Sequence, residues 1–273
     1  MTRLAASDGI ELYAETHGAG IPVLLSGALC TTAENYRFNV EPLVEAGAQL
    51  ILWDYRGHGK SDSPPDASAY HLDQVLDDLG RVLDWAAPGR AAVVGGLSFG
   101  GLASLHFAYR NPERVCGLLL IDSGPGFKNP EAQANWEASL ERTASYLESK
   151  GPAAFVKSRA AATLIGLRPE LPAAQAAGRA IGAQDPVGLA NFARGVAALA
   201  PPIIDELPEI EVPALVMIGE KDKPYLRAAD VMTARLPRAK RYTISGAGHI
   251  VNIEASDAFN AAAAGFIRQF ARS

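Results

Sequence analysis

Residues 93–101, VVGGLSFGG, place a serine between glycines where an apolar run gives way to a helical pattern. They contain the motif G-x-S-x-G as Gly96, Ser98 and Gly100. A serine raised on a sharp strand-to-helix turn needs strained backbone angles, and glycines two residues away on either side leave room for that turn. The following helix also directs its N-terminal N–H groups toward an anion formed beside the serine. The motif predicts that Ser98 is a nucleophile; the alternative is a glycine-rich turn without a chemical role.

A serine hydroxyl is a weak nucleophile until a base takes its proton, and histidine most often does so. His249 follows the last apolar run in the segment SGAGH, whose glycines let the imidazole fold over the end of that run. The other histidines suit structural roles: His17 in an early turn, His58 in a glycine-rich loop, His71 at a helix start and His106 within a helix. We therefore predict that His249 is the base.

The carboxylate that orients such a histidine is expected in a loop after a strand and before the histidine in sequence. Asp222 meets both conditions in the segment VMIGEKD. Two alternatives remain: Glu220, which lies closer to the strand end, and Asp122, which ends the strand after the nucleophile helix. Our prediction is that Asp222 completes a catalytic triad with Ser98 and His249.

Eight short apolar runs and five helical patterns are expected to position these residues. The runs are residues 4–6, 10–15, 23–26, 50–54, 91–95, 115–122, 214–218 and 241–244. The helical patterns are residues 34–45, 71–86, 98–110, 225–236 and 255–271. Asp8-Gly9 marks a hairpin between the first two runs. Alternation of strands and helices predicts an α/β fold, with a mostly parallel eight-stranded sheet flanked by helices.

One interval breaks the alternation. Between Asp122 and Pro213 the sequence has alanine-rich helical pieces separated by prolines and glycines, and no strand pattern. The sequence therefore predicts a core of residues 1–123 and 213–273, with residues 124–212 inserted as a helical cap.

Composition excludes several classes of function. The 273 residues carry a net charge of -5 and no long basic run, so neither nucleic acid nor an anionic membrane is an expected partner. No apolar stretch is long enough for a signal peptide or a spanning helix, which predicts a cytoplasmic protein. Two cysteines are too few for a disulfide framework or a metal cluster. The oligomeric state is not indicated.

Beyond the G-x-S-x-G motif, the chain resembles the α/β-hydrolase fold superfamily over nearly its whole length. The resemblance rests on three further patterns: Asp54-x-Arg56-Gly57-x-Gly59-x-Ser61, Gly219-x-x-Asp222, and Gly248-His249-x-x-Asn252-x-Glu254. In that family the backbone N–H of the residue after His-Gly forms half of the oxyanion hole. Ser26 stands in the place of that histidine, so the resemblance implies Ala28, or else Leu29, as one donor. Phe99, after the nucleophile, is the implied partner.

The resemblance also narrows the reaction. Residues 25–31, LSGALCT, and the pattern HIxNIExxDAF in residues 249–259 are similar to 3-oxoadipate enol-lactonases. Dehalogenase-like relatives would have Asp in place of Ser98, and carbon–carbon bond hydrolases usually have Trp where Ile250 stands. These features favour a serine hydrolase that cleaves a small carboxylic ester or lactone through an acyl-enzyme, without a metal or organic cofactor. The alternatives are carbon–carbon bond hydrolysis, haloperoxidase-like perhydrolysis, and a non-catalytic small-ligand receptor on the same fold.

Candidate substrate contacts lie near the predicted site and in the predicted cap. Leu29, Cys30, Trp136 and Ile250 are predicted to bind substrate. Further apolar candidates in the cap are Phe155, Leu164 and Phe192. The cap arginines, Arg159, Arg168, Arg179 and Arg194, are candidates for binding a substrate carboxylate, although a solvent-exposed role is the simpler interpretation of each.

Overall fold

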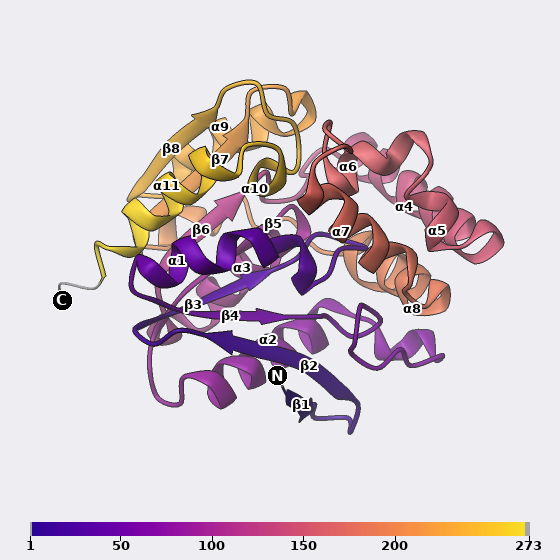
Figure 1. Ribbon diagram of the computed structural model, residues 1–273, viewed down its shortest axis with the longest axis horizontal. Helices are drawn as coiled ribbons and strands as arrows, with labels where there is room; N and C mark the ends of the chain where they lie inside the picture. The colour runs from indigo at the N-terminus through magenta and orange to yellow at the C-terminus, as the bar shows by residue number, and fades with distance from the viewer. Residues whose placement is uncertain (1, 271–273) are drawn as a thin grey trace.

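Figure 1 shows a computed structural model of the chain, which describes residues 2–270, as a central sheet with helices on both faces and a group of helices at one end. The sheet has the order β1-β2-β4-β3-β5-β6-β7-β8. Its strands are β1 (Thr2–Ala5), β2 (Glu11–His17), β3 (Ile21–Ser26), β4 (Ala48–Trp53), β5 (Ala92–Leu97), β6 (Val115–Ile121), β7 (Ala214–Gly219) and β8 (Ala239–Ile244). The predicted mostly parallel eight-stranded sheet is confirmed.

Only β2 runs in the opposite direction to the other strands of the sheet. β1 pairs antiparallel with β2 through the turn at Asp8-Gly9, and β2 pairs antiparallel with β4. From β4 to β8 all neighbouring strands are parallel. Their carboxyl ends therefore lie at one edge of the sheet, and loops far apart in sequence meet there.

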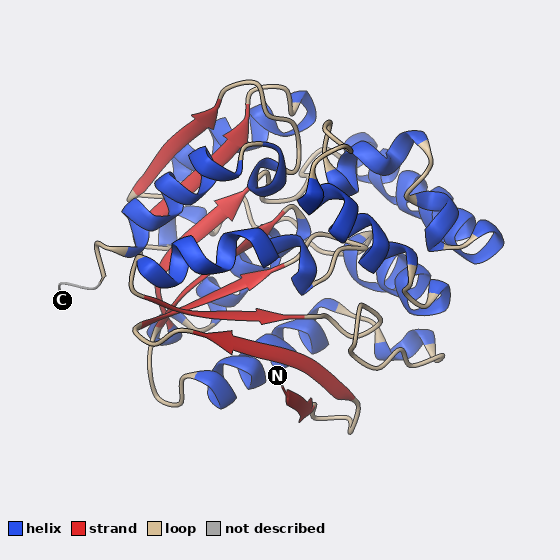
Figure 2. Cartoon of the chain, in the orientation of Figure 1, coloured by secondary structure: helices blue, strands red, loops and turns tan. Residues whose placement is uncertain are grey.

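Helices cover the two faces of the sheet (Figure 2). Those outside the insertion are η1 (Ala33–Asn39), α1 (Val40–Glu45), η2 (Ala67–Ala69), α2 (Leu72–Ala86), α3 (Phe99–Arg110), η3 (Pro112–Arg114), α9 (Lys223–Arg235), α10 (Val251–Glu254) and α11 (Ser256–Ile267). Side chains of α2, α3 and α9 pack in one buried cluster, and those of α1, α10 and α11 pack in the other. Residue 271, the end of the last predicted helix, lies outside the described residues.

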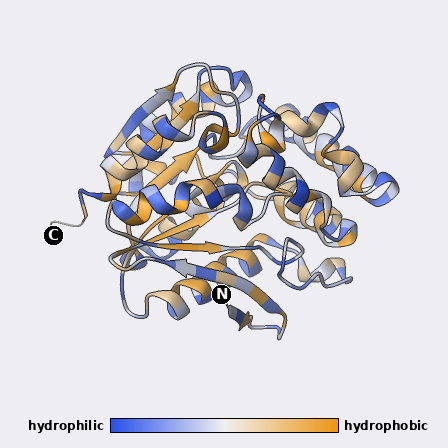
Figure 3. Ribbon diagram, viewed as in Figure 1, coloured by the Kyte–Doolittle hydropathy of each residue, from blue (hydrophilic) through white to orange (hydrophobic). Residues whose placement is uncertain are grey.

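The central strands β5 and β7 are buried along their whole length, which explains their nearly continuous apolar sequences. Figure 3 shows this hydrophobic band within the sheet, with mixed surfaces on the outer helices. Within residues 2–270, no helix is both long and apolar enough to cross a membrane.

The segment between β6 and β7 is helical. It contains α4 (Pro130–Lys150), α5 (Pro152–Phe155), η4 (Arg159–Ala161), α6 (Ala162–Ile165), α7 (Pro172–Gly182), α8 (Pro186–Phe192), the π-helix η5 (Ala193–Ala197) and η6 (Leu207–Glu209). Proline occupies the first helical position of α4, α5, α7 and α8, where its missing N–H costs no hydrogen bond. The predicted absence of strands holds for this fully described segment. Its definition as a cap of residues 124–212 stays a prediction.

Candidate active site

Ser98 lies at the junction of β5 and α3, in a strained backbone conformation. Its φ is 54° and its ψ is -114°, a region that non-glycine residues rarely occupy. The flanking glycines are required by close packing: a Cβ on either Gly96 or Gly100 would lie 2.5 Å from the Ser26 carbonyl oxygen. The G-x-S-x-G spacing thus lets β3 press against the turn that presents the serine.

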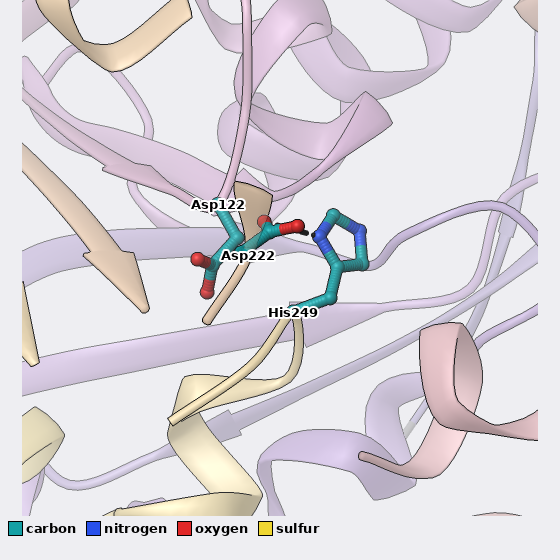
Figure 4. Close-up of side chains that lie close together, drawn as sticks. All are labelled: Asp122, Asp222 and His249. Atoms are coloured by element: carbon teal, nitrogen blue, oxygen red, sulfur yellow. Dashed lines mark hydrogen bonds and ion pairs between the residues drawn. The ribbon is translucent and has the colours of Figure 1, made fainter. Parts of the chain in front are cut away.

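His249 and Asp222 form a close pair at the same edge of the sheet. His249 Nδ1 lies 2.7 Å from Asp222 Oδ2, and both side chains are at most 10% exposed. Figure 4 shows the Asp222 carboxylate directed at this ring nitrogen. Glu254 fixes the backbone on either side of His249, because its carboxylate accepts hydrogen bonds from the N–H groups of Gly248 and Ile250, at 2.8 and 3.1 Å. The imidazole therefore has a fixed orientation.

The two alternative acids have other partners. Glu220 is exposed and accepts hydrogen bonds from the Ser245 hydroxyl and the Gly246 N–H. Asp122 is buried beside Asp222 (Figure 4), with its Oδ1 accepting the Gly219 N–H at 2.8 Å. Burial raises the pKa of Asp122 well above its usual value, and the neighbouring Asp222 raises it further.

Tyr225 contacts both Ser98 and His249. Its hydroxyl oxygen lies 3.4 Å from Ser98 Oγ, and its ring centroid is 4.8 Å from that of His249. Burial raises the Tyr225 pKa, so the hydroxyl stays protonated at neutral pH. No hydrogen bond joins Ser98 to His249, both of which the structure describes. Sequence reasoning missed Tyr225, although its place three residues after Asp222, in the first turn of α9, puts it at the correct edge.

The loop after β3 supplies the backbone groups expected to bind an oxyanion. Ala28 and Leu29 donate their N–H groups to no acceptor within residues 2–270. Phe99 opens α3, so its N–H has no partner within the helix. These free donors lie beside the Ser98 turn. The geometry does not distinguish Ala28 from Leu29.

Two aromatic side chains support the loop that starts at Ser26. Trp53 Nε1 donates to the Ser26 hydroxyl oxygen at 3.0 Å. The Tyr55 hydroxyl donates to the Gly27 carbonyl at 2.9 Å. The first half of the loop is therefore held by residues at and just after the end of β4.

The second half of the loop is held at Cys30, which has a left-handed φ of 66°. The Cys30 N–H donates to His58 Nε2 at 3.0 Å, and Gln184 Nε2 donates to the Cys30 carbonyl at 2.7 Å. Gln184 also accepts the Gly59 N–H through its Oε1 at 2.8 Å. A glutamine of the inserted segment thus links this loop to the His58 loop, a contact that no sequence motif indicated.

The Asp54–Ser61 pattern is explained by structural hydrogen bonds. Asp54 accepts the N–H groups of Ala33 and Lys60, and a Cβ at Gly59 would collide with its carboxylate. The fully buried Arg56 forms ion pairs with Asp78 and Asp8, each at 2.7 Å. These contacts stabilise the loop that carries His58, which agrees with the structural role predicted for that histidine.

A cavity of about 230 Å³ opens beside Ser98. It lies between the inserted segment, which contributes Trp136 from α4, and the core helices α3 and α9, which contribute Leu102 and Ala228. Leu29, Phe99 and Tyr225 complete the wall near the serine. This volume is below that of typical drug-sized ligand sites, which begin at roughly 300 Å³, so only a small group fits.

The predicted substrate contacts fall into two sets. Leu29 and Trp136 line the cavity. Cys30 and Ile250 do not, because both are buried in the packed core, where their side chains are at most 1% exposed. The other apolar candidates, Phe155, Leu164 and Phe192, also pack in buried clusters away from the cavity wall. Burial of Cys30 raises its thiol pKa to about 12, so this cysteine is not a thiolate at neutral pH.

The arginines named as candidates for binding a substrate carboxylate lie elsewhere. Arg194 pairs with Glu141 and Glu148, and Arg168 contacts Glu170 and the Glu254 carbonyl. Arg179 lines a separate surface groove, and Arg159 belongs to η4. None of these guanidinium groups lines the cavity beside Ser98.

Comparisons with known proteins agree with the fold. The family model described as the alpha/beta hydrolase fold matches residues 21–256. A 2-hydroxy-6-oxononadienedioate/2-hydroxy-6-oxononatrienedioate hydrolase of Burkholderia vietnamiensis is 30% identical, with 96% of this chain and 93% of that protein aligned.

Two solved structures have similar folds. A thermophilic esterase from Thermogutta terrifontis superposes with a TM-score of 0.86 at 26% identity, covering 99% of this chain and 100% of that one. An enol-lactonase from Burkholderia xenovorans gives 0.82 at 23% identity, covering 97% and 99%. At that lower identity the likeness shows the fold alone.

Proposed function

The chain belongs to the α/β-hydrolase fold family and is a hydrolase, and we propose that it cleaves a small carboxylic ester or lactone. The reaction passes through an acyl-enzyme on Ser98. The observation that carries the proposal is the placement of Ser98. It stands at a positive φ on the carboxyl edge of the sheet, where Tyr225 contacts both its hydroxyl and the His249 ring. His249 is in turn bonded to Asp222 at 2.7 Å.

The first half of the reaction forms the acyl-enzyme. Ser98 Oγ attacks the carbonyl carbon while its proton passes to His249 Nε2, and the carbonyl π electrons move to oxygen. The N–H groups of Ala28 and Phe99 stabilise the resulting oxyanion. When the oxyanion collapses, the bond to the alcohol oxygen breaks, and that oxygen takes the proton from His249.

The second half repeats these steps with water. His249 removes a proton from the water, whose oxygen attacks the acyl carbon. As the second tetrahedral intermediate collapses, the bond to Ser98 Oγ breaks, Oγ takes the proton back from His249, and the carboxylic acid is released. For a lactone, the alcohol and acid remain parts of one molecule.

Ser98 must exchange hydrogen-bond partners before it reacts. In the free enzyme its hydroxyl contacts Tyr225, at 3.4 Å. A bond of this length is weak, and catalytic hydrogen bonds often tighten only when substrate binds. The Ser98–His249 bond therefore forms as substrate enters.

The two carboxyl groups behind His249 have different roles. Asp222 carries the negative charge that holds the Nδ1 proton and stabilises the imidazolium. Asp122, whose pKa burial raises, remains protonated and supports the Asp222 loop through the Gly219 N–H.

The ester or lactone assignment draws on the relatives. One neighbour is named an esterase, and the lactone option rests on the similarity of residues 25–31 and 249–259 to 3-oxoadipate enol-lactonases. The Burkholderia vietnamiensis hydrolase favours a second candidate, hydrolysis of a carbon–carbon bond next to a ketone by the same three residues. Residues 124–212 would act in either case as a cap that closes the cavity.

Fluorophosphonate labelling tests the nucleophile, and a substrate panel tests the reaction. We expect one adduct per chain on Ser98, none on Ser98→Ala, and hydrolysis of p-nitrophenyl esters or simple lactones. Faster cleavage of a vinylogous diketone would favour the carbon–carbon alternative. If the folded protein forms no adduct and hydrolyses none of these compounds, the proposed function is wrong, and binding of small ligands without turnover would identify a receptor.

A further inference from the structure

The cavity beside Ser98 is apolar and, in the described part of the chain, lacks the cationic side chains that a substrate carboxylate would need. Its wall is built mainly from apolar side chains, those of Leu29, Leu102, Phe127, Trp136 and Ala228 among them. No lysine, arginine or histidine lines it within the described residues. A carboxylate placed there would lose its water and meet no cation, which is strongly unfavourable.

Polar groups in the wall are mostly engaged by the protein itself. Gln133 Nε2 donates to Glu137 and to the Ala198 carbonyl, each at 2.8 Å. Trp136 Nε1 donates to the Ala197 carbonyl at 2.9 Å. The Gln133 side-chain oxygen, which can only accept a hydrogen bond, and the hydroxyls of Ser98 and Tyr225, which contact each other, remain.

The nearest fixed charges are also unfavourable for an anion. Asp222 lies behind His249, whose ring packs on Tyr225. The cap arginines are held by carboxylates or lie at other surfaces, as Arg194 is by Glu141 and Glu148. No guanidinium of the described chain lines the space above Ser98, where a second carboxylate of a substrate would sit.

We infer that the group seated in this cavity is uncharged and apolar, with about six to nine non-hydrogen atoms, and that a carboxylate on that group prevents productive binding. The size follows from comparison with an apolar cavity of about 150 Å³, which holds benzene. The inference rests on the proposed function and specifies its substrate. It separates this chain from the relative named for a dienedioate, a substrate with a carboxylate at each end.

Matched esters test the inference on both sides of the scissile bond. On the acyl side, p-nitrophenyl hexanoate is compared with the p-nitrophenyl monoester of adipic acid, in which a carboxylate replaces the terminal methyl group of the six-carbon chain. The p-nitrophenyl ester of monomethyl adipate controls for length. On the alcohol side, p-nitrophenyl hexanoate is compared with 3-carboxy-4-nitrophenyl hexanoate. In the series whose charged group must occupy the cavity, we expect kcat/KM to be about 100-fold lower for the carboxylated ester than for p-nitrophenyl hexanoate. The kcat/KM of the methyl adipate ester should be close to that of p-nitrophenyl hexanoate.

An engineered cation provides the complementary test. Leu102→Arg puts a guanidinium in the wall, and the ratio of kcat/KM for neutral over charged ester should fall at least tenfold in the affected series. Ala138→Arg, on an exposed position of α4 outside the cavity, adds the same charge and should leave the ratio unchanged within twofold. If Leu102→Arg does not fold, Ala228→Arg places the cation on the opposite wall.

Two failures can be told apart. If neutral and carboxylated esters differ by less than tenfold in both series, or if Leu102→Arg and Ala228→Arg both leave the ratio unchanged, the inference is wrong while the hydrolase proposal stands. If no ester of either series is hydrolysed and Ser98 takes no fluorophosphonate, the proposed function itself fails.

Discussion

Two carboxyl groups lie behind His249, and they differ in their hydrogen bonds. Asp222 contacts the ring at 2.7 Å, whereas Asp122 accepts a backbone N–H and has one buried oxygen without a partner among the described residues. The Asp122 backbone has a left-handed φ of 42°, which non-glycine residues rarely adopt. The sequence predicted Asp222 as the acid, with Asp122 and Glu220 as alternatives. Because Asp222 contacts the His249 ring and Asp122 contacts a backbone N–H, we expect Asp222 to orient the histidine.

Substitution of each aspartate by asparagine separates the two roles. Asp222→Asn should lower kcat about 10⁴-fold, since an amide no longer holds the imidazole in its required tautomer. Asp122→Asn keeps an acceptor for the Gly219 N–H and replaces a group that is already neutral, so we expect less than a tenfold loss. Steady-state kinetics on one p-nitrophenyl ester measures both variants. The reverse order of the two losses would make Asp122 the orienting acid.

Tyr225 provides a second prediction at the residue scale. Tyr225→Phe removes the hydroxyl that holds Ser98 away from His249 but keeps the ring that packs on the imidazole. A weak neutral hydrogen bond is worth about 0.5 kcal/mol net, so kcat/KM should rise about two- to threefold. Rates of inactivation by a fluorophosphonate should rise in parallel. A tenfold fall in both would instead show that the hydroxyl stabilises the transition state.

His58 gives a prediction about pH. Burial lowers the His58 pKa to about 4, and the neutral ring accepts the Cys30 N–H at Nε2. Because the unfolded histidine titrates near 6.5, the unfolded state binds more protons between these values. This residue's contribution to stability, roughly 3 kcal/mol, is therefore complete above pH 6.5 and is lost as the pH falls toward 4.

A plot of the free energy of unfolding against pH will not show the His58 contribution clearly. Burial raises the pKa of Asp54 to about 6. This shift changes the free energy of unfolding in the opposite direction, because the folded state then takes up protons before the unfolded state as the pH falls below 6. The measurement is an NMR titration of the imidazole, with His58→Asn used to assign its signals. We expect no protonation of His58 between pH 7.5 and 5; a midpoint near 6.5 would contradict its described environment.

At the scale of elements, the apolar runs predicted the strands well because parallel strands in the centre of a sheet are buried on both faces. β5 and β7 were located within two residues at each end. The segment predicted as one helix over residues 34–45 is instead a 3-10 helix, η1, followed by α1. Its Asn39 is fully buried and bonds Asn252 and Asn260 of the last helices. Such contacts between distant segments leave no local pattern.

Gln184 connects the inserted segment to the loop expected to bind the oxyanion, and its removal is a test at this scale. Gln184→Ala leaves the Cys30 carbonyl and the Gly59 N–H without their buried partner, at a cost of about 1–3 kcal/mol for each unsatisfied group. We expect a lower free energy of unfolding by that order, together with a lower kcat, because the loop loses its orientation.

Gln175→Ala is the matched control for that variant. Gln175 lies on α7 in the same segment, and its side chain is exposed. Its substitution should change stability by less than about 0.5 kcal/mol and leave kcat unchanged. Urea unfolding and ester hydrolysis of the two variants are compared side by side. Equal effects of the two substitutions would mean that the Gln184 contacts do not support the loop.

At the scale of the whole molecule, the sequence predicted the sheet, its helices and the order of serine, acid and histidine. Each of these follows a strand, and parallel strands bring their carboxyl ends to one edge. The cavity was not predictable in the same way. Trp136 faces it while Phe155 and Phe192 do not, and the difference depends on how the insertion packs on α3 and α9. Of the arginines in the inserted segment that could have bound a carboxylate, Arg168 and Arg194 form surface ion pairs.

Formation of a covalent acyl-enzyme on Ser98 is the central claim, and one measurement tests it directly. The protein is mixed rapidly with excess p-nitrophenyl hexanoate, and samples quenched in acid during the first turnovers are digested and analysed by mass spectrometry. We expect the peptide that contains Ser98 to gain one hexanoyl group, and Ser98→Ala to gain none. Steady hydrolysis of the ester by a Ser98→Ala protein at the wild-type rate, or a hexanoyl group found only on another residue, would contradict the claim.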